Sequence, residues 1–341
     1  MSAALHIQAA GMVTCVGLDA ASSCAALRGR LDGFAETRFM GPDGEWLKGA
    51  AVPLPRNWIG LRRMAHLAAG ALADLRRQQA RALDGAPILL CLAEDTRPGR
   101  PIPDAAAFAR QVAEILELPA LPRLQVIAHG RPSGFVALDR ARRLIAAGED
   151  PVVILGVDSY LTAQSVAHFL GRSRLLTPAN ANGFIPGEAA AAVLCTAERA
   201  PLRLAGLGLA REPSYIQNTE GEDGLPLPMR GEGMTRAHEL ALDQAGCRHS
   251  DLVLKMGDLI GEAYWFKQMA LAMLRLQRER SAVQPIWSLA ASLGNIGAAA
   301  TPVLLAWAMT AAARGYVPPG PIILEASGDD GACGAAVVHR T

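Results

Sequence analysis

Apolar residues recur along this chain in two patterns, as short runs of strand length and as longer segments with helical spacing. The clearest case starts at the apolar run Leu124–Ala128 and ends at a second run, Pro151–Leu155, with apolar residues at helical spacing between them. The turn His129-Gly130-Arg131-Pro132 follows the first run. Pro132 suits a first helical position, because the N–H that it lacks would have no partner there. The pattern predicts strand, sharp turn, buried helix and strand.

The rest of the chain continues this alternation. Further strands are predicted at Leu5–Ala9, Pro87–Leu92, Leu202–Leu209, Leu252–Met256, Pro321–Ala326 and Ala335–His339. Helices are predicted at Ala20–Leu27, Leu61–Leu83, Phe108–Leu118, Ala163–Leu170, Met234–Ala245, Tyr264–Arg278 and Ala298–Ala313. The Gly- and Pro-containing segments Gly41–Pro55 and Arg211–Gly233 are expected to be loops.

The two halves of the chain show the same order of patterns. In each half an apolar helix leads to a buried strand, and a Gly-rich turn then leads to an Ala/Val strand, Gly187–Leu194 or Gly331–Val338. Strands that alternate with helices predict parallel sheets. We therefore expect two pseudo-repeated halves, 1–199 and 200–341, whose sheets share a middle layer of two buried helices.

Composition narrows the class of protein. Of 341 residues, 51% are hydrophobic and 19% charged, which favours a large buried core. The 33 basic and 32 acidic residues give a formal net charge of +1, which argues against a nucleic-acid partner. Six cysteines without C-x-x-C spacing are expected to be buried, reduced thiols of a cytoplasmic protein.

Other classes of site find no support in the sequence. The uncharged run Ile296–Ala313 contains Pro302 and is expected to be a buried helix, so no membrane association is predicted. The N-terminus has no basic segment ahead of an apolar core, so no signal peptide is expected. Metal-ligand spacing, a P-loop and a dinucleotide fingerprint do not occur, and no cofactor or metal is predicted.

Three motifs carry a resemblance to a known family. They are Gly183-Phe-Ile-Pro-Gly-Glu-Ala-Ala-Ala, Ser133-Gly-Phe-Val-Ala-Leu and Ser288-Leu-Ala-Ala-Ser-Leu-Gly-Asn-Ile-Gly-Ala-Ala-Ala. With them the chain resembles the β-ketoacyl synthase branch of the thiolase fold along essentially its whole length. The resemblance implies a five-layered α/β/α/β/α fold. It also implies a homodimer that pairs through the strand at about Leu124–Ala128.

The catalytic groups of that family are missing from this sequence. The resemblance places the nucleophilic cysteine at Arg131, the two histidines at Met256 and Asn295, and the lysine at Ala290. Loss of a catalytic nucleophile alone lowers activity by orders of magnitude. The resemblance therefore implies a divergent member without condensing activity.

A cation at the nucleophile position needs a partner, because burying it unpaired is unfavourable. The carboxylates expected on converging turns are Asp258, Glu262 and the pair Asp329-Asp330. We hypothesise that Arg131 pairs with one of them and plugs the former acyl pocket. The alternative is that it points to solvent or to a dimer interface. The residues expected to line this degenerate site are His129, Arg131, Asp258, Glu262, Asn295, Asp329 and Asp330. His129 reads either as a surrogate base or as a histidine at a strand end.

Three functions remain open. Asp258-Leu-Ile-Gly-Glu-Ala-Tyr264 and Ser327-Gly-Asp-Asp-Gly-Ala resemble a short bacterial ketosynthase-like group whose genes often lie beside type VI secretion effector genes. That resemblance implies an accessory protein that binds a secretion effector or its adaptor. The alternatives are an acyltransferase or acyl-carrier-binding protein, and an inactive chain-length-factor-like partner of an active synthase. Carrier binding predicts an open tunnel to Arg131, whereas partner binding predicts a filled one and an exposed apolar patch.

Overall fold

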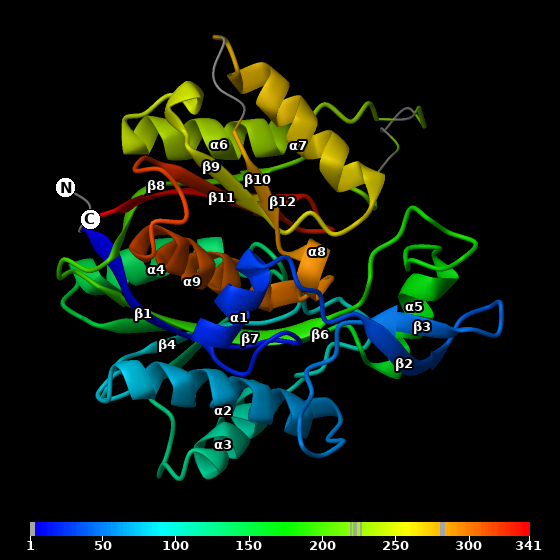
Figure 1. The fold of residues 1–341 in the computed structure, drawn as a ribbon, viewed down its shortest axis with the longest axis horizontal. Helices are drawn as coiled ribbons and strands as arrows, with labels where there is room; N and C mark the ends of the chain where they lie inside the picture. The colour runs from blue at the N-terminus through cyan, green and yellow to red at the C-terminus, as the bar shows by residue number, and fades with distance from the viewer. Residues whose placement is uncertain (1–3, 219, 221–223, 226, 280–283) are drawn as a thin grey trace.

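The computed structural model describes residues 4–218, 220, 224–225, 227–279 and 284–341. Its elements form five layers, with the two sheet layers separated by buried helices (Figure 1). Parts of the predicted loop Arg211–Gly233 lie outside the described residues. None of the helices in the described part of the chain is both long enough and apolar enough to cross a membrane.

Two half-sheets have the same topology. The first consists of β1 (Leu5–Val13), β4 (Ile88–Cys91), β5 (Leu124–Ile127), β6 (Val152–Ser159) and β7 (Glu188–Thr196). The second consists of β8 (Leu202–Arg211), β9 (Leu254–Gly257), β10 (Ile286–Ser288), β11 (Ile322–Ser327) and β12 (Ala332–Arg340). The spatial orders are β1-β7-β6-β4-β5 and β8-β12-β11-β9-β10, so each half runs first, fifth, fourth, second, third. The pseudo-repeat is therefore present at the level of topology.

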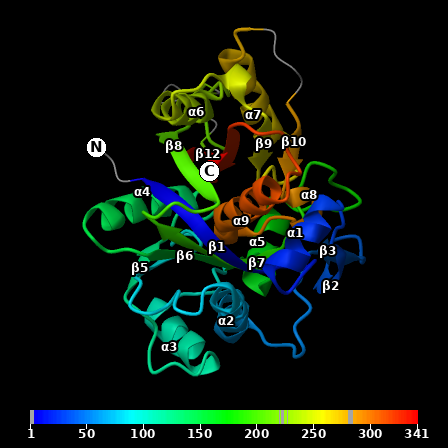
Figure 2. The ribbon, with the colours of Figure 1, turned by 60° about the vertical axis from the view of Figure 1, so that its left-hand side comes forward.

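The sheets differ from the expectation in two ways. Each half is mixed rather than parallel, because its last strand runs antiparallel to both of its neighbours. The halves also join into one ten-stranded sheet, since β1 and β8 pair antiparallel over Leu5–Ile7 and Leu202–Leu204. Beyond this short stretch of pairing the sheet twists, so the two half-sheets lie on opposite faces of the middle helix layer (Figure 2).

Two helices form the centre of the middle layer. They are α4 (Ser133–Ala146) and α9 (Ala300–Ala313), which follows the 3₁₀ turn η2 (Gly297–Ala299). Both contact strands of the two half-sheets. Helix α9 is apolar on all sides because it is enclosed on all sides, and it buries Val303, Leu304 and Trp307. This enclosure is the buried-helix layer that the sequence predicts.

Of the remaining helices, α1 packs against α9 in the middle layer, and most of the others cover the outer faces or the ends of the sheets. The first half carries α1 (Ala20–Arg28), α2 (Gly60–Gln78), α3 (Ala105–Ile115) and α5 (Ala163–Gly171). The second half carries α6 (Glu232–Ala245), η1 (His249–Asp251), α7 (Ala263–Leu276) and α8 (Ala290–Leu293). Helices α2 and α3 form one outer layer, and α6 and α7 form the other (Figure 1).

One predicted loop contains the second strand of a β-hairpin. Strands β2 (Ala35–Met40) and β3 (Trp46–Gly49) pair antiparallel, and β3 lies inside the segment Gly41–Pro55 that was expected to be irregular. Both strands are largely exposed, so they lack the apolar alternation by which a half-buried strand is found in a sequence. The three-residue strand β10 was missed for the same reason.

Candidate functional site

The turn before α4 is fixed from several sides. Gly130 has a positive φ of 61°, and a Cβ there would meet the Glu94 carboxylate. The N–H of Ser133 donates to the Gly130 carbonyl at 3.0 Å, and the N–H of Gly130 donates to the Leu92 carbonyl at 3.0 Å. The Thr301 hydroxyl on α9 donates to the Arg131 carbonyl at 3.0 Å. Arg131 is thus held where the first half-sheet meets both central helices.

The Arg131 side chain is buried and ion-paired. Only 1% of the residue is exposed. Its Nη1 donates to Asp258 Oδ2 at 3.0 Å, and its Nη2 donates to Asp329 Oδ1 at 3.1 Å. The guanidinium also lies 4.0 Å from the centre of the Trp265 ring, close enough for a cation–π contact. The pairing expected from the sequence is therefore present, with two carboxylates of the second half rather than one.

A second arginine completes this network. Arg174 Nε and Nη2 donate to the two oxygens of Glu262, each at 2.7 Å, and Arg174 Nη1 donates to Asp329 Oδ2 at 2.5 Å. The Trp265 indole N–H donates to Glu262 Oε2 at 2.9 Å. Glu262 therefore reaches Arg131 only through Arg174 and Trp265. Sequence reasoning missed Arg174, which follows α5 and belongs to no recognisable motif.

Burial and charge act on these carboxylates in opposite directions. Burial raises the pKa of Asp258, and Arg131 offsets only part of that effect. For Asp329 burial also favours the neutral form, but Arg174 and Arg131 outweigh it and lower the pKa. Burial opposes the charged form of Arg131, yet Asp258 and Asp329 together raise its pKa. Arg131 stays protonated, so it supplies neither a nucleophile nor a base.

The other degenerate positions hold structural side chains. Met256 is buried in β9 within the apolar core, and Ala290 begins α8. The Asn295 side-chain oxygen accepts the N–H of Gly297 at 3.1 Å, which shapes the turn into α9. The neighbouring lysine, Lys255, pairs with Glu325 at 2.9 Å. At the three positions to which the resemblance assigns the histidines and the lysine, this chain carries Met256, Asn295 and Ala290.

Two residues expected to line the site do not join the network. His129 is exposed, and its backbone N–H donates to the Ser133 hydroxyl at 2.9 Å. Asp330 accepts the N–H of Ala332 at 3.0 Å and so closes the turn before β12. Asp330 lines the same cavity as Asp329, and His129 lies exposed beside the turn, but neither pairs with the Arg131 guanidinium. Asp330 is therefore not one of the carboxylates that bind Arg131.

The cysteines do not provide a substitute nucleophile. All six thiols are free, and none lies on the turn before α4. Burial raises the pKa of Cys15 to about 12 and that of Cys24 to about 11. It also raises the pKa of Cys91, Cys195 and Cys333. A thiol with a raised pKa has almost no thiolate at neutral pH.

A second buried ion pair lies beside the first. Arg97, which is 7% exposed, donates to both oxygens of Asp158, with its Nη1 at 2.9 Å from Oδ2. The same Asp158 oxygen accepts the N–H of Ala298 at 2.9 Å, at the N-terminal end of α9. A cavity of about 220 Å³ adjoins this pair and is lined in part by Glu94, Arg172 and Asp329. Among the described residues, no group of three or more His, Cys, Asp or Glu side chains is arranged to hold a metal ion.

Comparison with known proteins shows that the chain is similar to ketosynthases in fold and, over part of its length, in sequence. No protein-family model matches the sequence. A protein of Streptomyces coelicolor assigned as polyketide beta-ketoacyl synthase 2 is 28% identical over 215 residues, which are 60% of this chain and 50% of that protein. The chain thus spans about half the length of that relative.

Solved structures match over nearly the whole chain. A ketosynthase in complex with its chain length factor from Xenorhabdus doucetiae superposes with a TM-score of 0.77 at 15% identity, covering 99% of this chain and 98% of that one. A type II polyketide synthase complex of an acyl-carrier protein and its hexaketide-bound ketosynthase gives a TM-score of 0.77 at 17% identity, covering 100% of both chains. This chain therefore has the thiolase-like α/β fold of the ketosynthases, with an ion-paired arginine at the turn before its first central helix.

Proposed function

We propose that this protein is a non-catalytic thiolase-fold protein that acts by binding another protein. The observation that carries the proposal is the buried Arg131 bound to Asp258 and Asp329. Decarboxylative condensation of the ketosynthase type needs a thiolate that takes the acyl chain and cationic or neutral donors around it. Here a guanidinium fills that position, and two carboxylates add negative charge where the thioester oxyanion would develop.

A sheet edge supports the partner-binding role. Strand β5 is the last strand of the ten-stranded sheet, so one side of its backbone has no neighbouring strand in the described part of the chain. Val126 in this strand is 49% exposed. An unpaired edge with an exposed apolar residue is suited to pairing with a strand of another chain. The homodimer proposed from the sequence uses this edge, and so would a heterodimer.

The resemblance of two motifs to the type VI secretion-associated group makes a secretion effector or its adaptor the first candidate partner. In this role the protein assists loading or delivery of the effector and works in the cytoplasm. The buried, ion-paired Arg131 supports such a role over acyltransfer, because a protonated guanidinium cannot take over an acyl chain.

A second candidate is a chain-length-factor-like partner of an active ketosynthase. The specific support is the match to a ketosynthase solved with its chain length factor and to the Streptomyces coelicolor relative. In this role the inactive subunit pairs with the active one across β5. The two candidates share one surface and one inactive site and differ in the partner.

Affinity purification from the native host, followed by mass spectrometry, separates the candidates. The bait is the tagged wild type, with Val126→Asp as the edge variant and Leu274→Asp as the control, since Leu274 is 76% exposed on α7. We expect a secretion effector or adaptor to be enriched by the wild type and the control and lost with Val126→Asp. Enrichment of a ketosynthase instead establishes the second candidate. Enrichment of acyl carrier protein alone contradicts both.

An activity assay tests the inactive site directly. We expect wild type and Arg131→Cys to release no CO₂ from malonyl-loaded carrier protein, because the cysteine alone lacks its histidines and lysine. An active ketosynthase is the positive control. Turnover by the wild type would overturn the non-catalytic assignment.

A further inference from the structure

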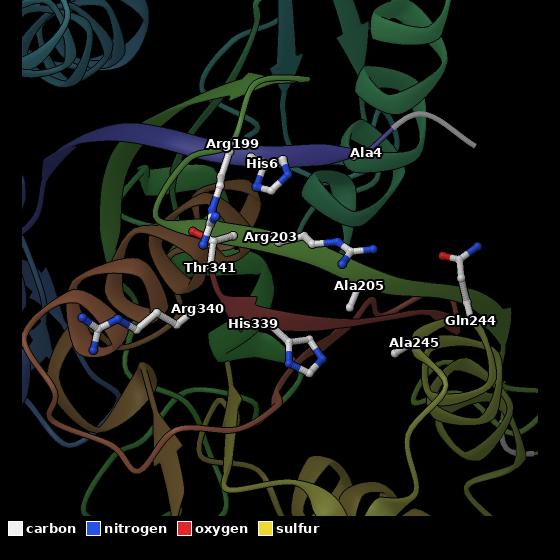
Figure 3. A pocket seen from close by; sticks show the side chains of 10 residues that line it. All are labelled: Ala4, His6, Arg199, Arg203, Ala205, Gln244, Ala245, His339, Arg340 and Thr341. Carbon is white, nitrogen blue, oxygen red and sulfur yellow. The ribbon is translucent and has the colours of Figure 1, made fainter. Parts of the chain in front are cut away.

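A basic pocket lies far from the Arg131 site. It has a volume of about 690 Å³ and opens where β1 and β8 begin and β12 ends, next to the last turn of α6 (Figure 3). Strand β12 begins beside Asp330 and reaches the pocket at its other end, so the two sites are about 30 Å apart at 3.3 Å per residue. The pocket plays no part in the function proposed above.

Three side chains form a row across its floor. Arg203 on β8 pairs in register with His6 on β1 and with His339 on β12. Residues opposite each other on adjacent strands project from the same face of a sheet. Figure 3 shows Arg203 between the two imidazoles, with Arg199 beside Thr341. The fold thus places an imidazole, a guanidinium and an imidazole side by side.

The positive charge of this pocket is not neutralised. Its lining includes Arg199, Arg203 and Arg340 and contains no Asp or Glu side chain. Within the described part of the chain, these three arginines have no ion pair, in contrast to the buried Arg97, Arg131 and Arg174. The whole chain carries only +1, so this clustering does not reflect general basicity.

Two neutral groups in the pocket have hydrogen-bonding capacity to spare. His6 is 7% exposed, and its Nδ1 is buried without a hydrogen-bond partner among the described residues. The Gln244 side-chain oxygen already accepts from the N–H of Leu207 at 2.9 Å and from Arg142 at 2.7 Å. Its amide nitrogen is therefore left to donate. A buried unpaired nitrogen is unfavourable unless a ligand satisfies it.

From this arrangement we propose that the pocket binds the phosphoryl group of a small organic phosphate. Guanidinium groups bind phosphate oxygens in a bidentate manner, the amide of Gln244 supplies further N–H donors, and the free Nδ1 of His6 donates once the bound anion favours protonation of the imidazole. The volume lies in the range of small-molecule sites and exceeds what a single inorganic phosphate fills. Free diphosphate and a phosphate ester present the same chemistry and differ in the organic group, which would occupy the remaining volume.

Isothermal titration calorimetry at low salt tests the site, with sodium pyrophosphate and ADP as the ligands. The proteins are the wild type, the pocket variant Arg203→Gln and the control variant Arg314→Gln. Arg203 and Arg314 are both exposed, so both variants should fold, and Arg314 lies outside the pocket lining. We expect both probes to bind the wild type and the control, and Arg203→Gln to weaken binding about tenfold or more. The His6 imidazole resonances should shift on titration of the wild type.

Three outcomes would overturn the proposal. The first is no binding of either probe at millimolar concentration. The second is equal binding by the wild type and Arg203→Gln, which would place the phosphate elsewhere. The third is a hexaglutamate peptide that binds more tightly than both probes and depends on Arg203, which would identify the pocket as a site for an acidic protein segment. Tighter binding of ADP than of pyrophosphate would support a phosphate ester over free diphosphate.

Discussion

The N-terminal ends of the two central helices face opposite charges. At α9 the Asp158 carboxylate accepts the N–H of Ala298, which is the arrangement that a helix dipole favours. At α4 the cation Arg131 lies two residues before the helix, and Asp258 and Asp329 in the other half of the chain compensate its charge. Both ends are thus neutralised by residues of the opposite half of the chain, and they differ in the sign of the charge that lies at the start of the helix. The difference shows that the start of a central helix can carry a charge of either sign, provided that residues distant in sequence compensate it.

The largest loss of stability should come from removing the cation that lies before α4. Arg131→Met leaves Asp258 buried without its partner, and we expect a loss of about 3–5 kcal/mol in the free energy of unfolding, measured in urea. Arg143→Met is the control, since Arg143 is 70% exposed in its ion pair and should lose less than about 1 kcal/mol. The double variant Arg131→Met, Asp258→Leu should be more stable than Arg131→Met. Equal losses for Arg131→Met and Arg143→Met would show that the buried pairing contributes nothing.

Removing the anion at α9 should have a somewhat smaller effect. Asp158→Asn takes the charge from Arg97 and from the N-terminal end of α9 but keeps a hydrogen-bonding side chain. We expect a loss of about 3 kcal/mol. Amide hydrogen exchange should accelerate in α9 more than in α2. Uniform acceleration in both helices would mean that Asp158 stabilises the fold without a special role at α9.

The acid dependence of stability should distinguish the two carboxylates of Arg131. The pKa of Asp329 is lowered in the folded state, so its contribution is complete above the ordinary pKa of about 3.9 and is lost as pH falls through the folded value. The pKa of Asp258 is raised, so its own contribution changes in the opposite direction. Urea unfolding between pH 6 and pH 3 should therefore show a shallower loss in Asp329→Asn than in the wild type. A steeper loss would reverse this assignment.

The smallest effect should come from the ring beneath Arg131. Trp265→Phe keeps an aromatic face but removes the indole N–H that binds Glu262. We expect a loss of about 1 kcal/mol, with the Arg131 pairing intact. Thermal unfolding of Trp265→Phe and Trp265→Ala separates the hydrogen bond from the ring contact. A Trp265→Phe variant as unstable as Trp265→Ala would assign the whole effect to the indole N–H.

Local sequence patterns were enough to predict the secondary structure on both sides of Arg131. The strand before the turn, the helix after it and the repeated order of the halves all follow from apolar spacing and from Gly and Pro positions. A pairing of Arg131 with one of Asp258, Glu262, Asp329 and Asp330 was expected, because a buried cation needs an anion, but the sequence did not say which of them would bind it. Strands β2 and β10 were not found, because exposed or very short strands carry no periodic signal.

Arg174, Trp265 and the pair Arg97–Asp158 were also missed. Their roles depend on which loops the folded chain brings together, and such contacts leave no trace in local spacing. The row His6, Arg203 and His339 is a similar case. It depends on the register of three strands from both halves, which a single sequence does not specify.

The position of α9 has a consequence for how the chain can be divided. This helix belongs to the second half by sequence, yet it covers β1, β6 and β7 of the first half. A polypeptide of residues 1–199 would expose that apolar sheet face to water. A polypeptide of residues 200–341 would expose the side of α9 that packs on the first half-sheet. We therefore expect each fragment to aggregate when it is expressed alone and both to become soluble when they are produced together. We propose that the two halves, although they repeat one strand order, fold as one cooperative unit.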